Sequence, residues 1–594
     1  MQRRHAMRPL ALFLRRLSTE EKGGRYLKIG SVRSLVREPS RPELVPSSRA
    51  SLEASGDLTA HLKWLLQKRI LNQDVFLIGP PGNLRSHIVL QFLELTNEEY
   101  EWLSITRDST EADIKQRREI RSGNASYSDL SAVRAAVEGR VLVIDGVEKA
   151  ERNVLPILNN LLENREMQLD DGRFLMHHAK FDRLSQKYSS DELHEMGLER
   201  VSEYFRVICL GLPVPRFPGY PLDPPLRSRF QCRSITDLPF STTLSACRSA
   251  TPRVSADEVE KLVSLAYAVS SLDQMPFPYV PLGNLARICG IWNVIPSLDT
   301  HSAFLLLYPC HAALSEGEQR RIDEFFKKFG VTRSTSRSHS SKMKTTEDGE
   351  RNGLVSFVST PTHERALAKL KASLELGDVF LLGSKGSGKS SVAREAARLL
   401  QARPYLHILY QDMNSRELLQ SRRMGQDGDT LWVDSPLVEA ARSGGLCILD
   451  GVDRLHHSAL SALAPLLHHR CIHLPDGSRL VGSREWEETR LKTGLTAEEL
   501  NMRGVSEISP SFRVLLLADS LSASSSSSSS DSLSSSRWLS SSILSLAPFV
   551  HLENLSESEA ASLLSALVSE ADRKSILAMT SFAHQLRNSH DPAV

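Results

Sequence analysis

The chain of 594 residues lacks the features that mark several classes of protein. Its seven cysteines are scattered and form no C-x-x-C pair, which argues against a disulfide scaffold and fits a reducing compartment. No apolar run approaches the roughly 18 residues that span a bilayer. The net charge is only +2, so no overall field favours nucleic acid or a membrane surface. What is left is a globular chain long enough for about two to four domains.

One motif stands out against this ordinary background. A complete phosphate-binding loop, G-x-x-x-x-G-K-[ST], runs from Gly383 to Ser390. Its glycines let backbone N–H groups turn toward phosphates, Lys389 can reach the outer phosphates, and the Ser390 hydroxyl can hold Mg²⁺. Residues 378–382 predict a buried strand before the loop, and residues 391–400 predict a helix whose N-terminus attracts anions. The predicted ATP contacts are Gly383, Ser384, Lys385, Gly386, Ser387, Gly388, Lys389, Ser390 and Ser391, and the predicted Mg²⁺ ligands are Ser390 and Asp450.

The order of motifs occurs twice along the chain. Three pairs of landmarks keep nearly one spacing: Gly79 and Gly383 are 304 positions apart, Asp145 and Asp450 are 305 apart, and Gly172 and Gly477 are 305 apart. Ordered blocks at one spacing indicate tandem duplication of a whole domain, because the period is far too long for a solenoid repeat.

The first loop departs from the motif at two positions. Leu84 stands where the second loop has a glycine, and its Cβ crowds the approach of a phosphate. Arg85 replaces the lysine, and a planar guanidinium differs from a flexible ammonium. We predict that the first repeat binds nucleotide weakly or not at all, through Gly79, Gly82, Arg85, Ser86 and Asp145.

Hydrolysis needs a carboxylate that holds Mg²⁺ and a group that orients the attacking water. Asp145 and Asp450 end apolar strands and suit the metal role. A glycine follows each of them, at the place where a catalytic glutamate is typical. Glu148 and Asp453 lie three residues beyond the aspartates and can substitute only if the turn swings them back. The expected catalytic carboxylates are therefore Asp450 and Asp453.

Two arginines of the first repeat suit a role in a neighbouring site. Arg227 and Arg229 follow a strand predicted at residues 205–210 and can project into an adjacent module as catalytic cations. The alternative is a surface pair bound to acidic side chains. The corresponding stretch of the second repeat, residues 540–547, has no arginine. The second repeat therefore has the complete loop, and we expect another module to complete its site.

The chain start and the domain plan follow from composition. Five arginines precede the first acidic residue, Glu20, beside an apolar face, which predicts a mitochondrial transit peptide and a matrix location; a disordered basic tail is the alternative. The basic cluster at residues 115–121 indicates a solvated helix face.

The second helical segment is shorter than the first, which suggests a fragment or a truncated isoform. The predicted domains are 1–50 transit peptide and linker, 51–240 first α/β core, 241–330 helical lid, 331–360 flexible linker, 361–552 second α/β core and 553–594 truncated lid.

Further segments carry a family resemblance. Residues 434–440 and 162–172, together with the duplicated loops, resemble the dynein-related (midasin-like) branch of the AAA+ ATPases. The resemblance implies an α/β fold of tandem P-loop AAA+ modules, each a parallel sheet flanked by helices with an α-helical lid. It also implies nucleotide-driven remodelling or assembly in a homo-oligomer or ring, without nucleic acid or a membrane span; the alternative is a non-hydrolysing, ATP-stabilised scaffold. The implied roles are Walker A for Gly383 to Ser390, Walker B for Asp450, arginine fingers for Arg227 and Arg229, sensor positions at Leu212 and Asp519, and a lid sensor arginine at Arg287.

Overall fold

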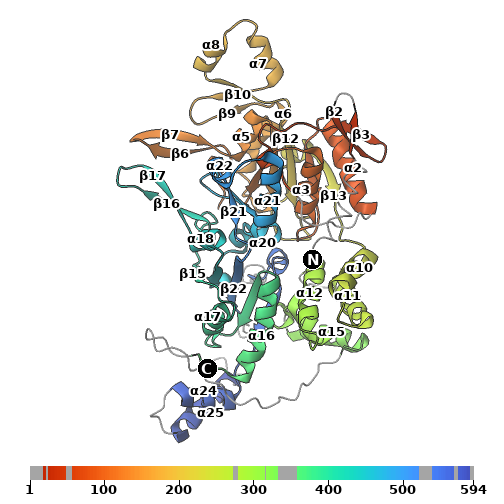
Figure 1. The fold of residues 1–594 in the computed structure, drawn as a ribbon, viewed down its shortest axis with the longest axis vertical. Coiled ribbons are helices and arrows are strands. Elements are labelled where there is room, and N and C mark those ends of the chain that lie inside the picture. Colours follow the sequence, from red (N-terminus) through yellow and green to blue (C-terminus); the bar gives the residue numbers. More distant parts are fainter. Residues whose placement is uncertain are drawn as a thin grey trace. The chain divides into compact units, whose positions relative to one another are not determined.

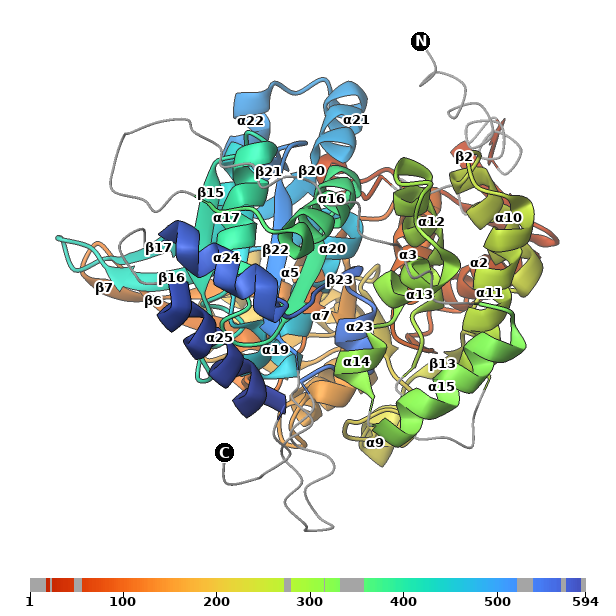
Figure 2. The ribbon, with the colours of Figure 1, turned by 90° about the horizontal axis from the view of Figure 1, so that it is seen from below.

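The computed structural model describes two compact units (Figures 1 and 2). The first unit comprises residues 1–237, 414–438 and 458–510, and the second comprises residues 238–413, 439–457 and 511–594. The basic residues of the predicted transit peptide and most of the predicted linker at 331–360 lie outside the described residues. The described residues are 18–21, 24–47, 56–271, 279–314, 316–331, 357–520, 538–567 and 573–588.

The first unit is built around a parallel five-stranded sheet. Its central strands are apolar on both faces because helices cover the sheet on both sides, as expected for parallel strands. Helices α2 (Gly56–Ile70) and α3 (Leu84–Thr96) cover one face, and α5 (Ser131–Glu138) and α6 (Leu158–Glu163) cover the other. In sheet order, the strands are β13 (Gln231–Ser234), β4 (Val75–Ile78), β12 (Arg206–Gly211), β8 (Val141–Asp145) and β5 (Tyr100–Ser104).

The second unit contains a sheet of the same topology. Its five strands are all parallel, and each takes the place of a strand of the first sheet. Its strands, in sheet order, are β23 (Phe549–Leu552), β14 (Val379–Gly383), β22 (Arg513–Asp519), β18 (Leu446–Asp450) and β15 (Pro404–Ile408). The predicted α/β fold of two tandem modules is therefore confirmed.

Helices complete the second unit. Helices α16 (Pro361–Leu376) and α17 (Lys389–Leu399) pack together beside the second sheet. Helix α18 (Pro436–Ser443) precedes strand β18 in the chain. Helices α24 (Glu557–Leu567) and α25 (Arg573–Asn588) pack on each other (Figure 2). The helices predicted between the two cores are α10 (Phe240–Ala250), α11 (Ala256–Ser270), α12 (Leu285–Val294), α13 (Thr300–Leu307) and α15 (Glu316–Lys328).

The basic cluster at residues 115–121 is not a helix face, so that prediction is wrong. Residues Gln116–Arg121 form strand β6, which pairs with β7 (Asn124–Asp129) in a hairpin. The turn at Ser122 and Gly123 has positive φ angles of 52° and 74°, which match the twist of a tight hairpin. The hairpin of β16 (Gln420–Met424) and β17 (Thr430–Asp434) lies beside it in the first unit (Figure 1).

Two small three-stranded sheets of the first unit are copies of one another. Each combines one antiparallel pair with one parallel pair in the same register. The first copy contains β9 (Met167–Gln168), β10 (Phe174–Met176) and β11 (Leu198–Arg200), with α7 (His178–Leu184) and α8 (Ser190–Glu195). The second copy contains β19 (Cys471–His473), β20 (Arg479–Gly482) and β21 (Val505–Ile508), with α20 (Ala464–His469), α21 (Ser483–Thr493) and α22 (Ala497–Met502).

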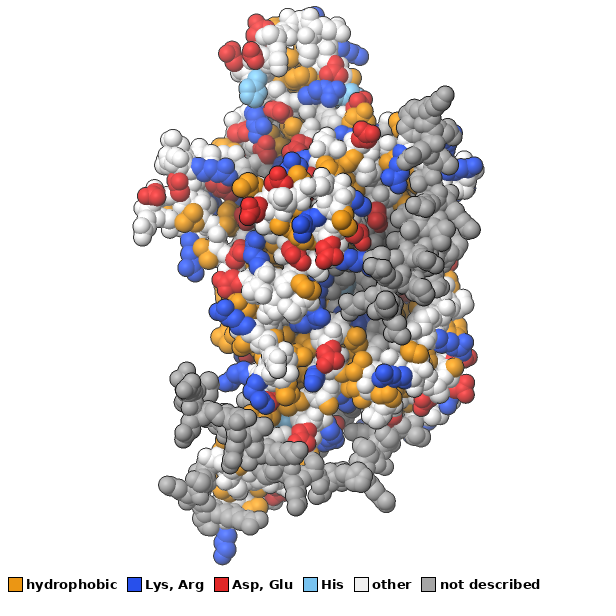
Figure 3. Space-filling view, viewed as in Figure 1, with side chains coloured by type: hydrophobic (Ala, Val, Ile, Leu, Met, Phe, Trp, Pro, Cys, Tyr) orange, Lys and Arg blue, Asp and Glu red, His pale blue; other side chains and the backbone are white. Residues whose placement is uncertain are grey.

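Helix length and surface charge are known over the part of the chain that the structure describes. Among the described residues, every helix is too short or too polar to cross a bilayer. On the face drawn in Figure 3, lysine and arginine are interspersed with aspartate and glutamate.

Candidate nucleotide site

The second phosphate loop connects β14 to α17 in the second unit. Gly386 and Gly388 have φ angles of +77° and +91°, a region that side chains with a Cβ rarely enter. A Cβ at Gly383 would lie 2.8 Å from the Ser387 hydroxyl, so a larger residue there would displace the Ser387 side chain. Among the described residues, no atom beyond the neighbours of Gly386 in the chain lies within 4 Å of the position that a Cβ at Gly386 would take, so there is free space on this side of the loop. The loop therefore has the shape and the free space of an anion cradle.

Lys389 begins α17 and turns back over the loop. Its ammonium donates hydrogen bonds to the carbonyl oxygens of Gly383 and Ser384, at 2.9 Å each. It also forms an ion pair with Asp519 at the end of β22, with 2.5 Å between Nζ and Oδ1. The two side chains are only 11% and 22% exposed. All three donors of the ammonium thus have partners within the protein, and a bound phosphate has to compete with Asp519 for Lys389.

The predicted metal ligands lie together. The Ser390 hydroxyl donates a hydrogen bond to Oδ2 of Asp450, with an oxygen–oxygen distance of 3.2 Å. Asp450 is the last residue of β18, and Ser390 is the second residue of α17. A hydroxyl and a carboxylate oxygen side by side next to an open loop are the donors that Mg²⁺ takes when it also binds phosphates. The residues present therefore fit a magnesium ion.

A left-handed glycine determines where Asp453 lies. Gly451 has a φ angle of +87° and starts a short 3₁₀ turn over Val452–Arg454. The turn brings Oδ1 of Asp453 within 3.1 Å of the backbone N–H of Asp519, which donates to it. The first repeat has the same contact, because the backbone N–H of Leu212 donates to the buried Glu148 at 3.2 Å. Each carboxylate thus accepts from the backbone at the end of the neighbouring strand, and Asp453 positions Asp519 in this way.

Sequence reasoning missed two residues that contact the loop, His363 and Asn554, and a third, Glu559, that bonds to the helix carrying His363. His363 on α16 is 4% exposed, and its Nε2 lies 3.3 Å from the Ser387 carbonyl oxygen. Asn554 forms a hydrogen bond with the Ser384 hydroxyl. Glu559 on α24 accepts one from the Thr362 hydroxyl at 3.0 Å. In each of these three bonds the two residues lie 24 to 197 positions apart in the sequence, so the sequence contained no signal for the pairing. The one local signal was the capping pattern from Ser556 to Glu559.

The first loop is filled by its own arginine. The Arg85 side chain is 9% exposed, and its Nη1 donates to the carbonyl oxygens of Gly79 at 2.8 Å and Gly211 at 2.6 Å. A guanidinium held by two backbone carbonyls at the base of the loop is not free to meet a phosphate. The cavity of about 110 Å³ that borders this loop at Asn83 is far below the roughly 300 Å³ of small-molecule pockets.

The backbone of the first loop differs for a simple reason. Gly388 precedes α17 in a left-handed conformation, whereas its counterpart Leu84 is the first residue of α3. A leucine avoids positive φ, so the helix begins one residue earlier. The Ser86 hydroxyl, the counterpart of the Ser390 hydroxyl, hydrogen-bonds to Nε2 of His469 at 2.7 Å. Ser86 is thus engaged by a side chain of the second repeat.

The three predicted arginines lie in different environments. Arg229 pairs with Glu163 and donates to the Pro225 carbonyl, so it has an acidic partner in its own repeat. Arg227, on α9 (Pro224–Ser228), is exposed, and within the described part of the chain its side chain makes no hydrogen bond or ion pair. Arg287 donates to the Asp378 carbonyl at 2.6 Å, at the start of β14, and this is the strand end opposite the phosphate loop.

Comparison with known proteins agrees with this geometry. A family model of the AAA domain, dynein-related subfamily, matches residues 74–230 and 378–535. The chain is 40% identical over 603 residues to von Willebrand factor A domain-containing protein 8 of Mus musculus, a match covering 96% of this chain and 31% of the mouse protein. It is 38% identical over 125 residues to Protein NorQ of Paracoccus denitrificans, covering 20% of this chain and 45% of that protein. It is 36% identical over 92 residues to Denitrification regulatory protein NirQ of Pseudomonas aeruginosa, covering 16% of this chain and 35% of that protein.

Each match thus covers less than half the length of the relative. The two segments that match the family model make up more than half of the chain, and each contains a phosphate loop between a parallel strand and a helix. On this basis the chain belongs to the dynein-related subfamily of the AAA+ ATPases.

Proposed function

We propose that the second repeat binds Mg–ATP and hydrolyses it slowly, and that the nucleotide state moves one module against another in remodelling or assembly. The observation that carries the proposal is the cluster of Lys389, Ser390 and Asp450 beside an open loop with two left-handed glycines. Mg²⁺, when bound there, would neutralise the charge that develops on the transferred phosphoryl group. Ser390 and Asp450 would hold the ion, and Lys389 would bind the outer phosphates.

The first repeat serves a structural role in this proposal. Arg85 already occupies the loop, and Ser86 is bonded to His469. The proposal assigns both nucleotide binding and hydrolysis to the second repeat. Arg227, which is exposed, is the residue best placed to complete the site of another module.

A non-hydrolysing scaffold is the second candidate, and one observation favours it. Gly451 follows Asp450 where a catalytic glutamate is typical of this family, and Asp453 is engaged with the backbone of Asp519 rather than free to polarise water. In that case ATP would only rigidify the second module.

Calorimetry with the purified chain tests the binding step. Lys389→Ala should abolish Mg–ATP binding, whereas Arg85→Ala should leave it nearly unchanged, because Arg85 is bonded to carbonyls within its own loop. The two variants are matched, because each removes the cationic side chain at the equivalent position of its loop. Greater damage from Arg85→Ala would reverse the assignment of the repeats.

A turnover assay separates the two candidates. Phosphate release by the wild type that is lost in Asp450→Asn supports the ATPase. Tight binding with no release above the level of Asp450→Asn supports the scaffold.

The proposal places the protein in the mitochondrial matrix, supported by the arginine-rich, acid-free start of the chain. Import of the chain into isolated mitochondria, with protection from external protease, checks this placement. A variant with Arg3, Arg4, Arg8, Arg15 and Arg16 replaced by glutamine should fail to enter. Equal protection of both proteins contradicts the proposal.

A further inference from the structure

A small pocket lies within the first unit, at the carboxyl end of the edge strand β5. Its volume is about 150 Å³, below the roughly 300 Å³ at which pockets for larger ligands begin. The first repeat contributes the end of β5 and the starts of β6 and α5, and the second repeat contributes residues within 415–419 and 472–477. Ligands of parallel α/β sheets commonly bind at the carboxyl ends of the strands. The pocket therefore has the position and the size of a site for a small molecule.

Two guanidinium groups of the pocket share one carboxylate. Nη2 of Arg416 lies 2.8 Å from Oδ2 of Asp113, and Nη2 of Arg117 lies 3.7 Å from Oδ1 of Asp113. Glu119, on the same strand as Arg117, is paired with Arg121. Burial lowers the pKa of Arg117 and Arg416 lowers it further, while Asp113 and Glu119 oppose this change only in part. The two arginines of the pocket thus retain one positive charge that Asp113 does not balance.

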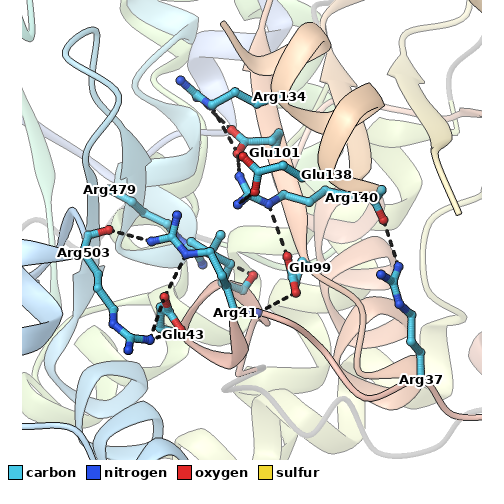
Figure 4. A network of polar contacts seen from close by, with 12 residues as sticks. Arg37, Arg41, Glu43, Glu99, Glu101, Arg134, Glu138, Arg140, Arg479 and Arg503 are labelled. Atoms are coloured by element: carbon cyan, nitrogen blue, oxygen red, sulfur yellow. Dashed lines mark hydrogen bonds and ion pairs between the residues drawn. The ribbon is translucent and has the colours of Figure 1, made fainter. Parts of the chain in front are cut away.

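The other ionisable groups of the pocket leave this charge in place. Arg134 lines the pocket too, but it donates hydrogen bonds to the carboxylate of Glu101 at 2.9 and 3.4 Å (Figure 4). Burial, followed by Arg479, lowers the pKa of His473 to about 3, so His473 is uncharged near neutral pH. Asp108 is exposed, and solvent screens its charge. The pocket therefore favours a ligand with one negative charge.

Two buried donors of pocket residues make no hydrogen bond within the described part of the chain. Trp102 on β5 is 7% exposed, and its indole Nε1 has no acceptor there. The same is true of Nε of Arg117, whose side chain is 12% exposed. Nearly all buried polar groups of proteins have a partner. Two such donors in residues of one pocket indicate that an acceptor comes from outside the chain.

Much of the remaining wall is apolar. Its buried members include Ile105, Leu130, Leu419 and Leu474, each at most 9% exposed. A bare inorganic ion would leave this surface without an apolar contact, whereas a ligand with a short hydrocarbon body would cover it.

The second repeat does not contain the same set of polar groups. Strand register and helix position identify the equivalent residues of the two repeats. The counterparts of Trp102, Arg117 and Arg134 are Leu406, Ser421 and Glu439. One aromatic donor and two cations are thus specific to the first repeat, so the chemistry of the pocket does not follow from the shared fold alone.

We propose that this pocket binds a small monocarboxylate, a molecule with one carboxylate group on a short apolar body. The carboxylate lies beside Arg117 and Arg416 and balances their excess charge. The apolar body lies against Leu130 and Leu474. A small rotation of Trp102 toward the ligand gives its indole N–H an acceptor.

A monocarboxylate fits the pocket better than a phosphate does. A phosphate group carries about −1.5 to −2 charges at pH 7, which exceeds the unbalanced charge of the arginines and would repel Asp113. The site goes beyond the proposed function and does not depend on nucleotide binding, because every residue that lines it belongs to the first unit, whereas the complete phosphate loop belongs to the second.

Saturation-transfer NMR with the full chain tests the proposal, because this method detects weak ligands of large proteins. The probes are acetate, butyrate and benzoate, with butyramide as the uncharged match to butyrate. At least one carboxylate should bind saturably, with a dissociation constant between about 10 µM and about 10 mM, as expected for so few ligand atoms. No saturable binding of any of the three carboxylates would overturn the proposal. Binding that butyramide equals, or that inorganic phosphate at the same concentration displaces, would overturn it as well.

Variants locate the bound probe in the pocket. Arg117→Met keeps the apolar stem and removes the charge, and Arg416→Met does the same at a side chain that is 44% exposed. Each should raise the dissociation constant at least about tenfold. Trp102→Phe removes the N–H donor and should raise it about three- to tenfold. The matched control is Arg118→Met, at the next residue of β6, which is exposed and does not line the pocket; it should change binding less than about twofold.

Thermal melting identifies any variant that fails to fold. If Arg117→Met is lost in this way, Arg416→Met decides alone, because its side chain is partly in solvent. Unchanged binding by either variant in its folded form would overturn the proposal. Calorimetry with Mg–ATP on the same samples reports separately on the proposed nucleotide site.

Discussion

Replacing Asp519 by asparagine should tighten ATP binding at the second repeat. Asp519 holds Lys389 through a 2.5 Å ion pair at the end of β22. A triphosphate must draw Lys389 away from this carboxylate and then sit near it. Asparagine keeps the size and can keep a hydrogen bond to Lys389, but it removes the negative charge.

The magnitude follows from charge and burial. Two unit charges at about 4 Å interact by roughly 4 kcal/mol at an effective dielectric constant of about 20. Solvent screening and the remaining amide hydrogen bond reduce the effect, because the side chains of Lys389 and Asp519 are 11% and 22% exposed. We expect a gain of about 1 to 2 kcal/mol in binding free energy, or a dissociation constant lower by roughly 5- to 30-fold.

Isothermal titration of Mg–ATP into the wild type and Asp519→Asn measures the difference directly. Asp453→Asn is the control, because Asp453 accepts from the Asp519 backbone and an amide oxygen can do the same. That variant should change the dissociation constant by less than about threefold. Equal or weaker binding by Asp519→Asn would refute the idea that Asp519 competes with phosphate for Lys389.

Three further predictions concern stability. Arg85→Ala should cost about 2 to 4 kcal/mol in denaturant unfolding, because the Gly79 carbonyl loses its buried donor; no loss would mean that Arg85 does not hold the first loop. Arg479→Met should cost about 3 to 5 kcal/mol by leaving Glu485 buried and unpaired, and adding Glu485→Leu should recover most of it; a single variant as stable as the wild type would contradict this reasoning. Burial, followed by Arg479, lowers the pKa of His473 from 6.5 to about 3, so only the unfolded chain gains this proton as the pH falls below about 6.5. Stability should therefore drop by up to about 1.4 kcal/mol per pH unit between those values, and His473→Gln should flatten the slope of unfolding free energy against pH; an unchanged slope would show that His473 is not responsible.

The sequence predicted the fold and the second loop because their signals are local. The apolar run before Gly383 and the glycine-rich turn after it specify a strand, a cradle and a helix within about twenty residues. The constant spacing of the repeats then predicted the second sheet from the first. From Leu84 the sequence predicted only that a Cβ crowds the phosphate, and the earlier start of α3 at Leu84, where Gly388 is left-handed, was not foreseen.

Contacts between segments far apart in the chain could not be predicted from the sequence. Arg85 could be identified as a changed cation, but its acceptor on Gly211 lies 126 positions away. The bond between Lys389 and Asp519 spans 130 positions. The β6–β7 hairpin was mistaken for a helix face because its charges masked a Ser-Gly turn signal. A cluster of charges indicates that residues are exposed to solvent, but it does not tell a helix from a strand. The turn residues determine whether the chain forms a hairpin.

The two phosphate loops differ in the groups that hold their cationic side chain. In each loop, backbone carbonyl oxygens accept hydrogen bonds from one cationic side chain. In the second repeat the cation is the ammonium of Lys389, shared with a carboxylate that a phosphate can displace. In the first repeat the guanidinium of Arg85 bonds directly to two backbone carbonyls, with no mobile anion between them. Backbone carbonyls cannot be displaced without unfolding the strand ends. The loop of the second repeat is therefore a reversible site, whereas the loop of the first repeat is part of the core.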